Sequence, residues 1–210
     1  PVTVKFSGFQ NSTSGGSLQT SIATVRVTLS YIEATSGSGS VITNETGVQS
    51  NAMKLVASKP TVTVGAGNTD TLILGSENKV GEFTVTADAN GKIGVGSSSI
   101  NVTGVGITSL GISAGRVADG NTTITGSSVA GSSTLGITFS PAYEVAAGTS
   151  KTFSVFATVN GVAVSGITPY VASSYASSTS FVWYDTIGGN TAQDGSSIYN
   201  FPTSSFTTRR

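Results

Sequence analysis

The strongest constraint on the fold is an alternation of apolar and polar residues that recurs along much of the chain. It is seen in residues 2–6 (VTVKF), 23–32 (ATVRVTLSYI), 60–64 (PTVTV), 83–87 (FTVTA) and 151–159 (KTFSVFATV). A period of two places successive side chains on opposite faces of an extended chain, as in a half-buried strand. These segments are also rich in Val, Thr, Ile and Phe, which suit a pleated surface. The alternation therefore predicts an all-β protein.

Turn-forming residues separate these segments. Asn160-Gly161 lies between two alternating runs and is the residue pair that most readily supplies two positive φ angles, so it predicts a tight hairpin turn. Residues 88–91 (DANG) and 119–121 (DGN) predict two further turns, and residues 148–150 (GTS) lead into a strand. Turns about every ten residues between antiparallel strands are typical of an immunoglobulin-like β-sandwich, and we predict that fold class.

The chain contains no histidine and no cysteine among its 210 residues. It therefore lacks the commonest general acid–base group, the commonest metal ligand and the commonest thiol nucleophile. Without disulfides the fold must be held by its hydrophobic core, which a chain of this length can build. The composition argues against an enzyme and predicts no cofactor, with calcium kept as the one candidate ion.

Charge is scarce and balanced. Lys and Arg number 10, Asp and Glu number 10, and charged residues form 10% of the chain, against about 25% in an average soluble domain. A neutral, weakly charged surface favours association between copies of a protein. The basic residues are scattered, with Arg209-Arg210 the only adjacent pair, which argues against nucleic-acid binding.

The sequence also bears on location. No run reaches the roughly 18–20 apolar residues that a membrane-spanning helix needs. The chain opens at Pro1 without a basic and apolar leader, which we interpret as a mature form or a piece of something longer. The absence of thiols fits either redox compartment and, on balance, favours the outside of the cell. We expect an extracellular location at the cell surface.

An internal similarity predicts the domain organisation. Residues 21–42 align with residues 160–181 at an offset of 139, with Tyr31 against Tyr170, and a domain-sized offset is what tandem domains give. We therefore predict N-terminal strands from a preceding unit, or a donor segment, at residues 1–58. These strands would have open edges, and they either pack on the rest of the chain or complete a sheet in a neighbouring molecule. The remaining two segments are a sandwich at 59–186 and an extended aromatic tail at 187–210.

An ordered set of four motifs resembles a known class of surface domains. The motifs are MKLVASKPT at residues 53–61, VGEFTVTAD at 80–88, AGTSKTF at 147–153 and SFVWYD at 180–185. In this order they resemble the tandem immunoglobulin-like domains of secreted surface proteins from candidate-phyla-radiation bacteria of the Patescibacteria type. The resemblance covers residues 50–186, about two thirds of the chain.

This resemblance implies a component of a surface layer, a filament or an adhesin, and it transfers no catalytic residue. Two departures stand out. Tyr184 stands where the related domains carry Ser, and the C-terminal segment differs from their usual close. The departures leave open whether the C-terminus ends the native protein or is specialised for assembly.

Two kinds of polar site are candidates. Asp88 and Asn90 supply two oxygen-bearing side chains in one turn, which predicts a calcium site, with ordinary turn capping as the alternative. Sequons for N-linked glycosylation lie in polar stretches that we expect to be turns; chance occurrence in a Ser/Thr-rich chain is the alternative. The sequons begin at Asn11, Asn44, Asn101 and Asn121.

Aromatic residues are densest near the C-terminus. They allow two interpretations: a plug that closes the core of the sandwich, or an exposed platform that stacks on sugars or on a neighbouring subunit. The members that we take as candidate assembly or binding residues are Trp183, Tyr184, Tyr199, Phe201 and Phe206, beside Phe181.

These observations lead to a ranked set of functional hypotheses. The first is a structural subunit of an extracellular surface layer or filament that binds copies of itself through β-edges and terminal segments. An adhesin or carbohydrate-binding module, in which loops or aromatics hold a glycan, is second. A viral coat or decoration protein is the remaining structural alternative.

Overall fold

The computed structural model of the chain divides it into two compact units, Pro1–Val56 and Ala57–Arg210. The predicted boundary lies two residues later, after residue 58. The predicted strand at residues 2–6 and the sequon at Asn11 lie outside the described residues. The structure describes residues 23–25, 28–29, 32–35, 37–39, 41–44, 48–49, 53–67, 71–185 and 192–209.

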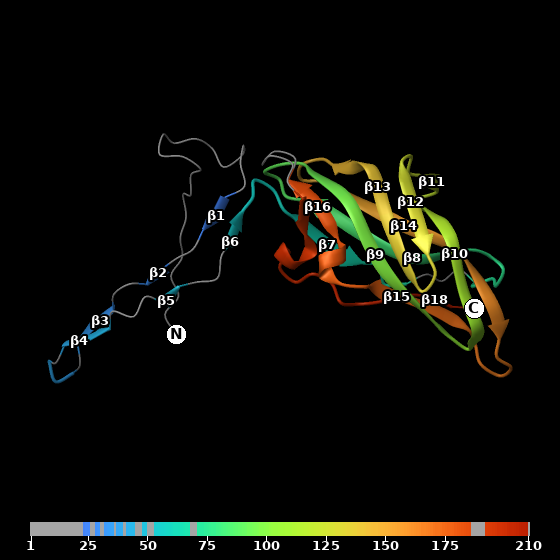
Figure 1. The fold of residues 1–210 in the computed structure, drawn as a ribbon, viewed down its shortest axis with the longest axis horizontal. Helices are drawn as coiled ribbons and strands as arrows, with labels where there is room; N and C mark the ends of the chain where they lie inside the picture. Colours follow the sequence, from blue (N-terminus) through green and yellow to red (C-terminus); the bar gives the residue numbers. More distant parts are fainter. Residues whose placement is uncertain are drawn as a thin grey trace. The chain divides into compact units, whose positions relative to one another are not determined.

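The described strands of the first unit form a two-stranded antiparallel ribbon, which can be followed in Figure 1. Its three strand pairs are nested along the sequence, so that the outermost strands pair with each other and the innermost strands flank a turn at residues 37–39. The pairs are β1 (Ala23–Val25) with β6 (Met53–Leu55), β2 (Thr28–Leu29) with β5 (Val48–Gln49), and β3 (Ile32–Thr35) with β4 (Val41–Asn44).

The pairing register gives the spacing between the three strand pairs. From β1 to β2 the chain advances three residues, from Val25 to Thr28, while the returning strand recedes four, from Met53 to Gln49. The same difference recurs between the β2–β5 pair and the β3–β4 pair.

The described residues of the second unit form a twelve-stranded antiparallel sheet with two short 3₁₀ turns. Its elements are β7 (Pro60–Val64), β8 (Ser76–Ala87), β9 (Ile93–Val105), β10 (Ile107–Asp119), β11 (Thr122–Thr123), β12 (Ser127–Gly131), β13 (Thr134–Val145), β14 (Ser150–Ala163), β15 (Tyr170–Tyr175), η2 (Ser178–Ser180), β16 (Val182–Asp185), β17 (Ala192–Asp194), η3 (Gly195–Ser197) and β18 (Phe206–Arg209).

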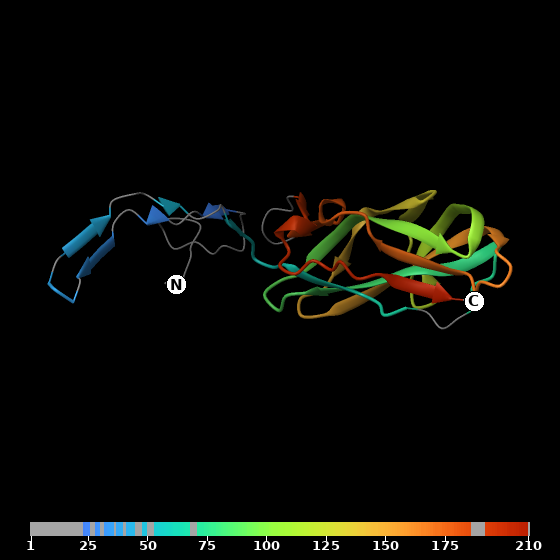
Figure 2. The ribbon, with the colours of Figure 1, turned by 90° about the horizontal axis from the view of Figure 1, so that it is seen from below.

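This sheet folds back on itself into a sandwich, whose two layers are visible in Figures 1 and 2. The strand order is β17-β16-β9-β13-β12-β10-β14-β8-β7, and β15 pairs with the far half of β9 and with β18. The sheet nearly closes, because the Thr208 hydroxyl of β18 donates to the Lys79 carbonyl of β8 at 2.5 Å. The predicted all-β antiparallel sandwich is confirmed.

The core follows from the alternation in the sequence. Along β8 and β14 the apolar residues of the FTVTA and KTFSVFATV segments are buried, except Phe156, whose ring lies under the Arg116 guanidinium, and the Thr residues between them are more exposed. Phe83 and Phe153 occupy opposite positions in the two strands, and their rings stack with centroids 5.0 Å apart. Facing aromatic and β-branched side chains of this kind stabilise neighbouring strands beyond the area that they bury.

Two predicted turns are confirmed. Residues 88–92 connect β8 to β9, with the Asp88 side chain accepting a hydrogen bond from the Asn90 N–H at 2.9 Å. Gly120 and Asn121 form the two-residue connection between β10 and β11, where Gly120 has a φ of 57°. Positive φ at this position is the conformation that glycine adopts at little cost.

The predicted hairpin at Asn160-Gly161 is wrong. Both residues lie within β14, which continues to Ala163 and pairs with β10 on both sides of the dipeptide. The register between β10 and β14 shifts here, with Ser109 at a φ of 53° and Gly161 at 145°. Gly161 thus has the positive φ that predicted a turn, but it lies at a register shift within the continuous pairing of β10 with β14.

The C-terminal segment, predicted as an extended tail, contributes to the same sheet. β17 pairs with β16, and β18 pairs with β15, so the described part of this segment forms edge strands of the sandwich.

Among the described residues, no helix has the length and apolar character needed to cross a membrane.

Candidate functional site

Two features of the described residues are candidates for function, and the first is the edge of the ribbon. Each of its strands pairs with one other strand within the described part of the chain. The outer side of each strand therefore carries backbone N–H and C=O groups without a strand partner there. Thr28 and Val41 are exposed on this ribbon, and Val41 is an apolar residue with 57% of its surface exposed.

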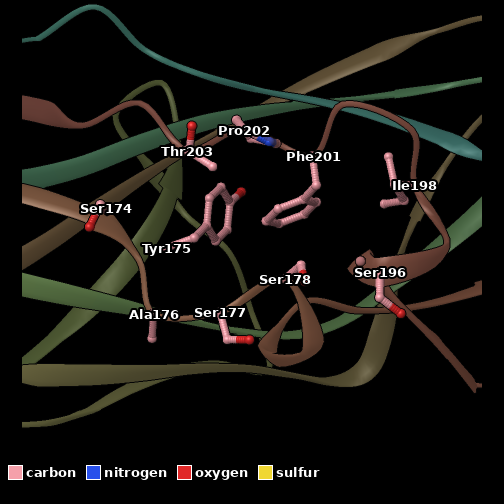
Figure 3. Close-up of a pocket in the computed structure, with 11 residues that line it drawn as sticks. Ser174, Tyr175, Ala176, Ser177, Ser178, Ser196, Ile198, Phe201, Pro202 and Thr203 are labelled. Atoms are coloured by element: carbon pink, nitrogen blue, oxygen red, sulfur yellow. The ribbon is translucent and has the colours of Figure 1, made fainter.

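The second feature is a cleft of about 510 Å³ on the second unit, drawn in Figure 3. Segments far apart in the sequence form it: the end of β15 with η2, and η3 with the chain that leads to β18. The lining residues are Ser174, Tyr175, Ala176, Ser177, Ser178, Gly195, Ser196, Ile198, Phe201, Pro202 and Thr203.

Two aromatic rings occupy the centre of the cleft. The rings of Tyr175 and Phe201 lie with centroids 4.7 Å apart and an interplanar angle of 59°. Phe181, which is fully buried, packs against both rings. Its ring centroid lies 6.2 Å from that of Tyr175 and 5.7 Å from that of Phe201. The Phe83 ring also packs against Tyr175, with the two ring centroids 5.9 Å apart. The aromatic core of the sandwich thus continues into the floor of the cleft.

The two short turns beside the cleft are held by their own side chains. The Ser177 hydroxyl accepts a hydrogen bond from the Thr179 N–H at 3.2 Å at the start of η2. Asp194 does the same for η3, accepting from the Ser196 N–H at 2.9 Å and from the Ser196 hydroxyl. These are the caps expected of Ser and Asp before a helical turn.

Gly195 lets the two turns approach each other closely. A Cβ atom on this residue would lie 2.5 Å from the Ser178 carbonyl oxygen and 2.8 Å from a ring carbon of Phe201. Both distances are shorter than any normal contact, so a larger residue would push η2, η3 and the Phe201 ring apart. Glycine at this position therefore sets the width of the cleft.

The Tyr175 hydroxyl is turned away from solvent. It is buried and has no hydrogen-bond partner among the described residues. Burial raises the pKa of this hydroxyl well above its ordinary value of 10.0, because the phenolate would be left without water. Tyr175 therefore offers the cleft the face of a neutral ring.

The cleft carries hydroxyl groups on both sides of the rings. Ser177, Ser178 and Ser196 lie along one side and Thr203 lies on the other, as Figure 3 shows. The hydroxyls of Ser174, Ser178 and Thr203 have no hydrogen-bond partner within the described part of the chain. The lining contains no charged side chain among the described residues. The cleft can therefore offer neutral donors, neutral acceptors and two ring faces.

The predicted aromatic platform is corrected by the burial of its members. Trp183 and Phe206 are each 1% exposed, so they belong to the core, and Trp183 donates its indole N–H to the Asp194 carbonyl at 3.2 Å. Tyr184 is half-buried on β16. Tyr199 is 83% exposed, and Phe201 lines the cleft. The five residues do not form one surface, because alternation along β16 and β18 turns Trp183 and Phe206 inward.

The predicted calcium residues form a capped turn. Asp88 accepts from the backbone N–H and from the side-chain amide of Asn90, at 2.9 and 2.6 Å. This occupies the carboxylate in an Asx turn. Across the described residues, no group of three or more Asp, Glu, His or Cys side chains is placed to hold a metal ion.

The described sequons differ in their surroundings. Asn121 is exposed in the turn between β10 and β11, and Asn44 ends β4 of the ribbon. Asn101 lies inside β9, paired with Thr134 on one side and Ser174 on the other. Its side-chain oxygen accepts from the Thr134 hydroxyl at 2.7 Å. The expected turn position is therefore wrong for Asn101, because a strand rich in Ser and Thr has the polar composition that is typical of a loop.

Sequence reasoning missed most of the cleft. Tyr175 and the hydroxyls of Ser174 and Ser178 come from one Ser-rich run, SSYASSTS at residues 173–180, and Thr203 comes from a second polar run. The sequence feature that could have indicated a binding site is the presence of an aromatic residue, Tyr175 or Phe201, within each of these polar runs. Nothing in the sequence alone says that the two runs meet.

Comparisons with known proteins add little to this picture. No protein-family model matches the chain, and no curated protein sequence matches it. A crystal structure of a DUF4466 family protein from Parabacteroides merdae ATCC 43184 is similar over 72% of this chain, with 10% sequence identity and a TM-score of 0.29. The chain spans 45% of that protein.

Proposed function

We propose that the chain is a structural subunit of an extracellular cell-surface assembly, a layer or a filament, and that copies associate through the edges of the ribbon. The observation that carries the proposal is the pairing of the ribbon, in which each described strand has one strand partner. A strand with an unpaired outer side is a ready template for a strand of another molecule.

The stability of a two-stranded ribbon supports the same conclusion. An isolated hairpin buries little apolar surface and is marginally stable in water. Adding a third strand from a second copy satisfies the backbone groups of an edge and covers apolar side chains such as Val41. Association would therefore stabilise the ribbon beyond the pairing that its strands have within the described residues.

The charge of the ribbon also favours contact between copies. Residues 23–55 contain four charged side chains, Arg26, Glu33, Glu45 and Lys54, with two of each sign. Soluble proteins commonly protect their edge strands with charges, lysine above all. A ribbon with so few charges has little repulsion to oppose the approach of a second one.

The second unit suits the role of a rigid building block. Its core is dense in fully buried side chains, including Phe153, Phe181 and Trp183. The proposal assigns no catalytic step and no calcium ion to this unit. The cell-surface location rests on the resemblance of the motifs in residues 50–186 and on the scarcity of charge.

Light scattering of the purified chain at increasing concentration tests this proposal. The weight-average mass should rise above the 21.0 kDa of one chain. A Thr28→Lys/Val41→Lys variant, which places charges on the exposed ribbon positions, should stay at the mass of one chain. Ile167→Lys is the matched control, because Ile167 is an exposed aliphatic residue of the second unit; this variant should associate like the parent chain. A constant monomer mass, or loss of association in the Ile167 variant alone, would overturn the proposal.

A further inference from the structure

The chemistry of the cleft on the second unit points to a ligand, independently of the ribbon. Its volume of about 510 Å³ lies within the range of small-molecule sites, about 300–1,000 Å³. Besides Tyr175, whose hydroxyl is buried, five of the eleven lining residues carry a hydroxyl group: Ser174, Ser177, Ser178, Ser196 and Thr203.

The neutral lining limits the class of ligand. Phosphates and carboxylates are normally held by Arg, Lys or clustered backbone N–H groups, and cationic ligands by carboxylates or open aromatic cages. The lining residues supply none of the charged groups. A ligand that uses this cleft therefore has many neutral polar groups and at least one apolar face.

We propose that the cleft binds a neutral saccharide. The faces of Tyr175 and Phe201 would contact the C–H face of a sugar ring, and the hydroxyls of Ser178 and Thr203 would bond its hydroxyl groups from the two sides. Serine and threonine hydroxyls both donate and accept, which matches the dual character of sugar hydroxyls. The side-chain hydroxyls of Ser178 and Thr203 have no competing partner in the described part of the chain.

The site is preorganised, which lowers the entropic cost of binding. The Tyr175 ring is held by Phe83, Phe181 and Phe201. Capping side chains fix the short turns on either side, and Gly195 holds them at close approach. The cleft therefore has a fixed floor and fixed sides before a ligand arrives.

A proline-rich peptide is the competing occupant, because such peptides also bind aromatic grooves. In an aromatic groove, the tyrosine hydroxyl and the indole N–H are the ring-borne groups that can donate to a peptide carbonyl. Here the Tyr175 hydroxyl is buried, and the Trp183 N–H is bonded to Asp194. The aromatic groups of the cleft thus lack the donors that favour a peptide.

The test is a titration of the isotope-labelled full chain, followed by amide NMR shifts. The probes are tetrasaccharides of β-1,4-glucose, α-1,4-glucose, mannose and N-acetylglucosamine, with a proline-rich decapeptide as the competing probe. We expect saturable shifts at residues 174–178 and 195–203 with at least one sugar. Trp183, the chain's only tryptophan, lies beside η3 and gives a second readout by fluorescence.

Matched variants distinguish binding in the cleft from binding elsewhere. Phe201→Ala should weaken sugar binding by about tenfold or more, and Tyr199→Ala, outside the cleft lining and exposed, should leave it unchanged. A Ser178→Ala/Thr203→Ala variant removes two hydroxyls that have no hydrogen-bond partner in the described part of the chain, so it should bind the sugar more weakly while staying folded. Saturation by the peptide alone, absence of shifts at about 10 mM of every sugar, or equal binding by parent and cleft variants would each overturn the assignment.

Discussion

The Asp185 carboxylate, fully buried at the end of β16, accepts a hydrogen bond from the backbone N–H of Ala57 at 2.6 Å. Ala57 is the first residue of the second unit, so this bond joins the two residues across 128 positions of the sequence. Hydrogen bonds to a charged group contribute about 1.5–3 kcal/mol to stability, more than neutral ones.

Replacement of Asp185 should therefore be costly. Asp185→Ala is expected to lower the free energy of unfolding by about 2–4 kcal/mol. The control is Glu144→Gln, which removes one partner of the exposed Lys92–Glu144 pair and should cost less than about 1 kcal/mol. Urea unfolding followed by Trp183 fluorescence measures both. Equal costs for the two variants would show that the buried carboxylate does not support the fold.

Tyr175→Phe should stabilise the chain. The variant keeps the ring that packs on Phe201 and removes a buried hydroxyl without a partner. An unpartnered buried polar group costs about 1–3 kcal/mol, so the gain should be about 1 kcal/mol. The same variant should bind a saccharide as the parent does, because only the ring faces the cleft. A loss of stability in urea unfolding would show that the hydroxyl has a partner after all.

The stability of the chain should fall in alkali. Burial raises the pKa of Tyr175 above 10.0, so the folded state keeps a proton that the unfolded state releases, and stability falls as the pH rises above that value. The pKa of Lys151 is raised above 10.5, first by its bond to Asp119 and then by Tyr143. The stability that this raised pKa contributes is present below pH 10.5 and is lost as the pH rises through the folded value.

Unfolding measured between about pH 8 and pH 12 tests this account. The parent chain should show a steady free energy at the lower end and a decline above about pH 10. Tyr175→Phe should decline less steeply, since one of the two groups is gone. Identical slopes for the two proteins would mean that Tyr175 ionises freely in the folded state.

Gly115 should tolerate no side chain. A Cβ at this position in β10 would lie 1.7 Å from the Phe156 carbonyl oxygen, at a register shift between β10 and β14. Gly115→Ala should therefore cost about 3 kcal/mol or more, or prevent folding. Gly111→Ala is the control on the same strand, because its nearest contact would be an ordinary 3.8 Å from the Asn160 Cβ. A thermal melt that gives similar melting temperatures for both variants would contradict the pairing of β10 with β14 at Gly115.

Local patterns in the sequence were enough to predict the class of fold. Alternation located β7 at residues 60–64 and the inward-facing parts of β8 and β14, because burial on one face of a strand directly requires it. The same pattern could not give the strand order, which depends on long-range pairing such as that between β9 and β16.

The two wrong turn predictions, at Asn160-Gly161 and at Asn101, have a common physical cause. Asn160-Gly161 has the backbone freedom of a turn, yet the flanking segments both pair with β10, so tertiary pairing decides its role. Asn101 is surrounded by polar residues and still lies in a central strand. Local composition indicates which backbone conformations a segment can adopt, and tertiary strand pairing determines whether it forms a turn or a strand. The cleft was missed for the same reason, since Tyr175 and Phe201 meet only in the folded chain.

Electron microscopy of the purified chain at high concentration, with and without EDTA, tests the central claim most directly. Assembly through the ribbon edges predicts sheets or filaments with a regular repeat. These should persist in EDTA, because Asp88 and Asn90 form a capped turn and, among the described residues, no group of three Asp, Glu, His or Cys side chains is placed to hold a metal ion. They should be lost in the Thr28→Lys/Val41→Lys variant. Monodisperse single particles of the parent chain at every concentration would contradict a self-assembling subunit.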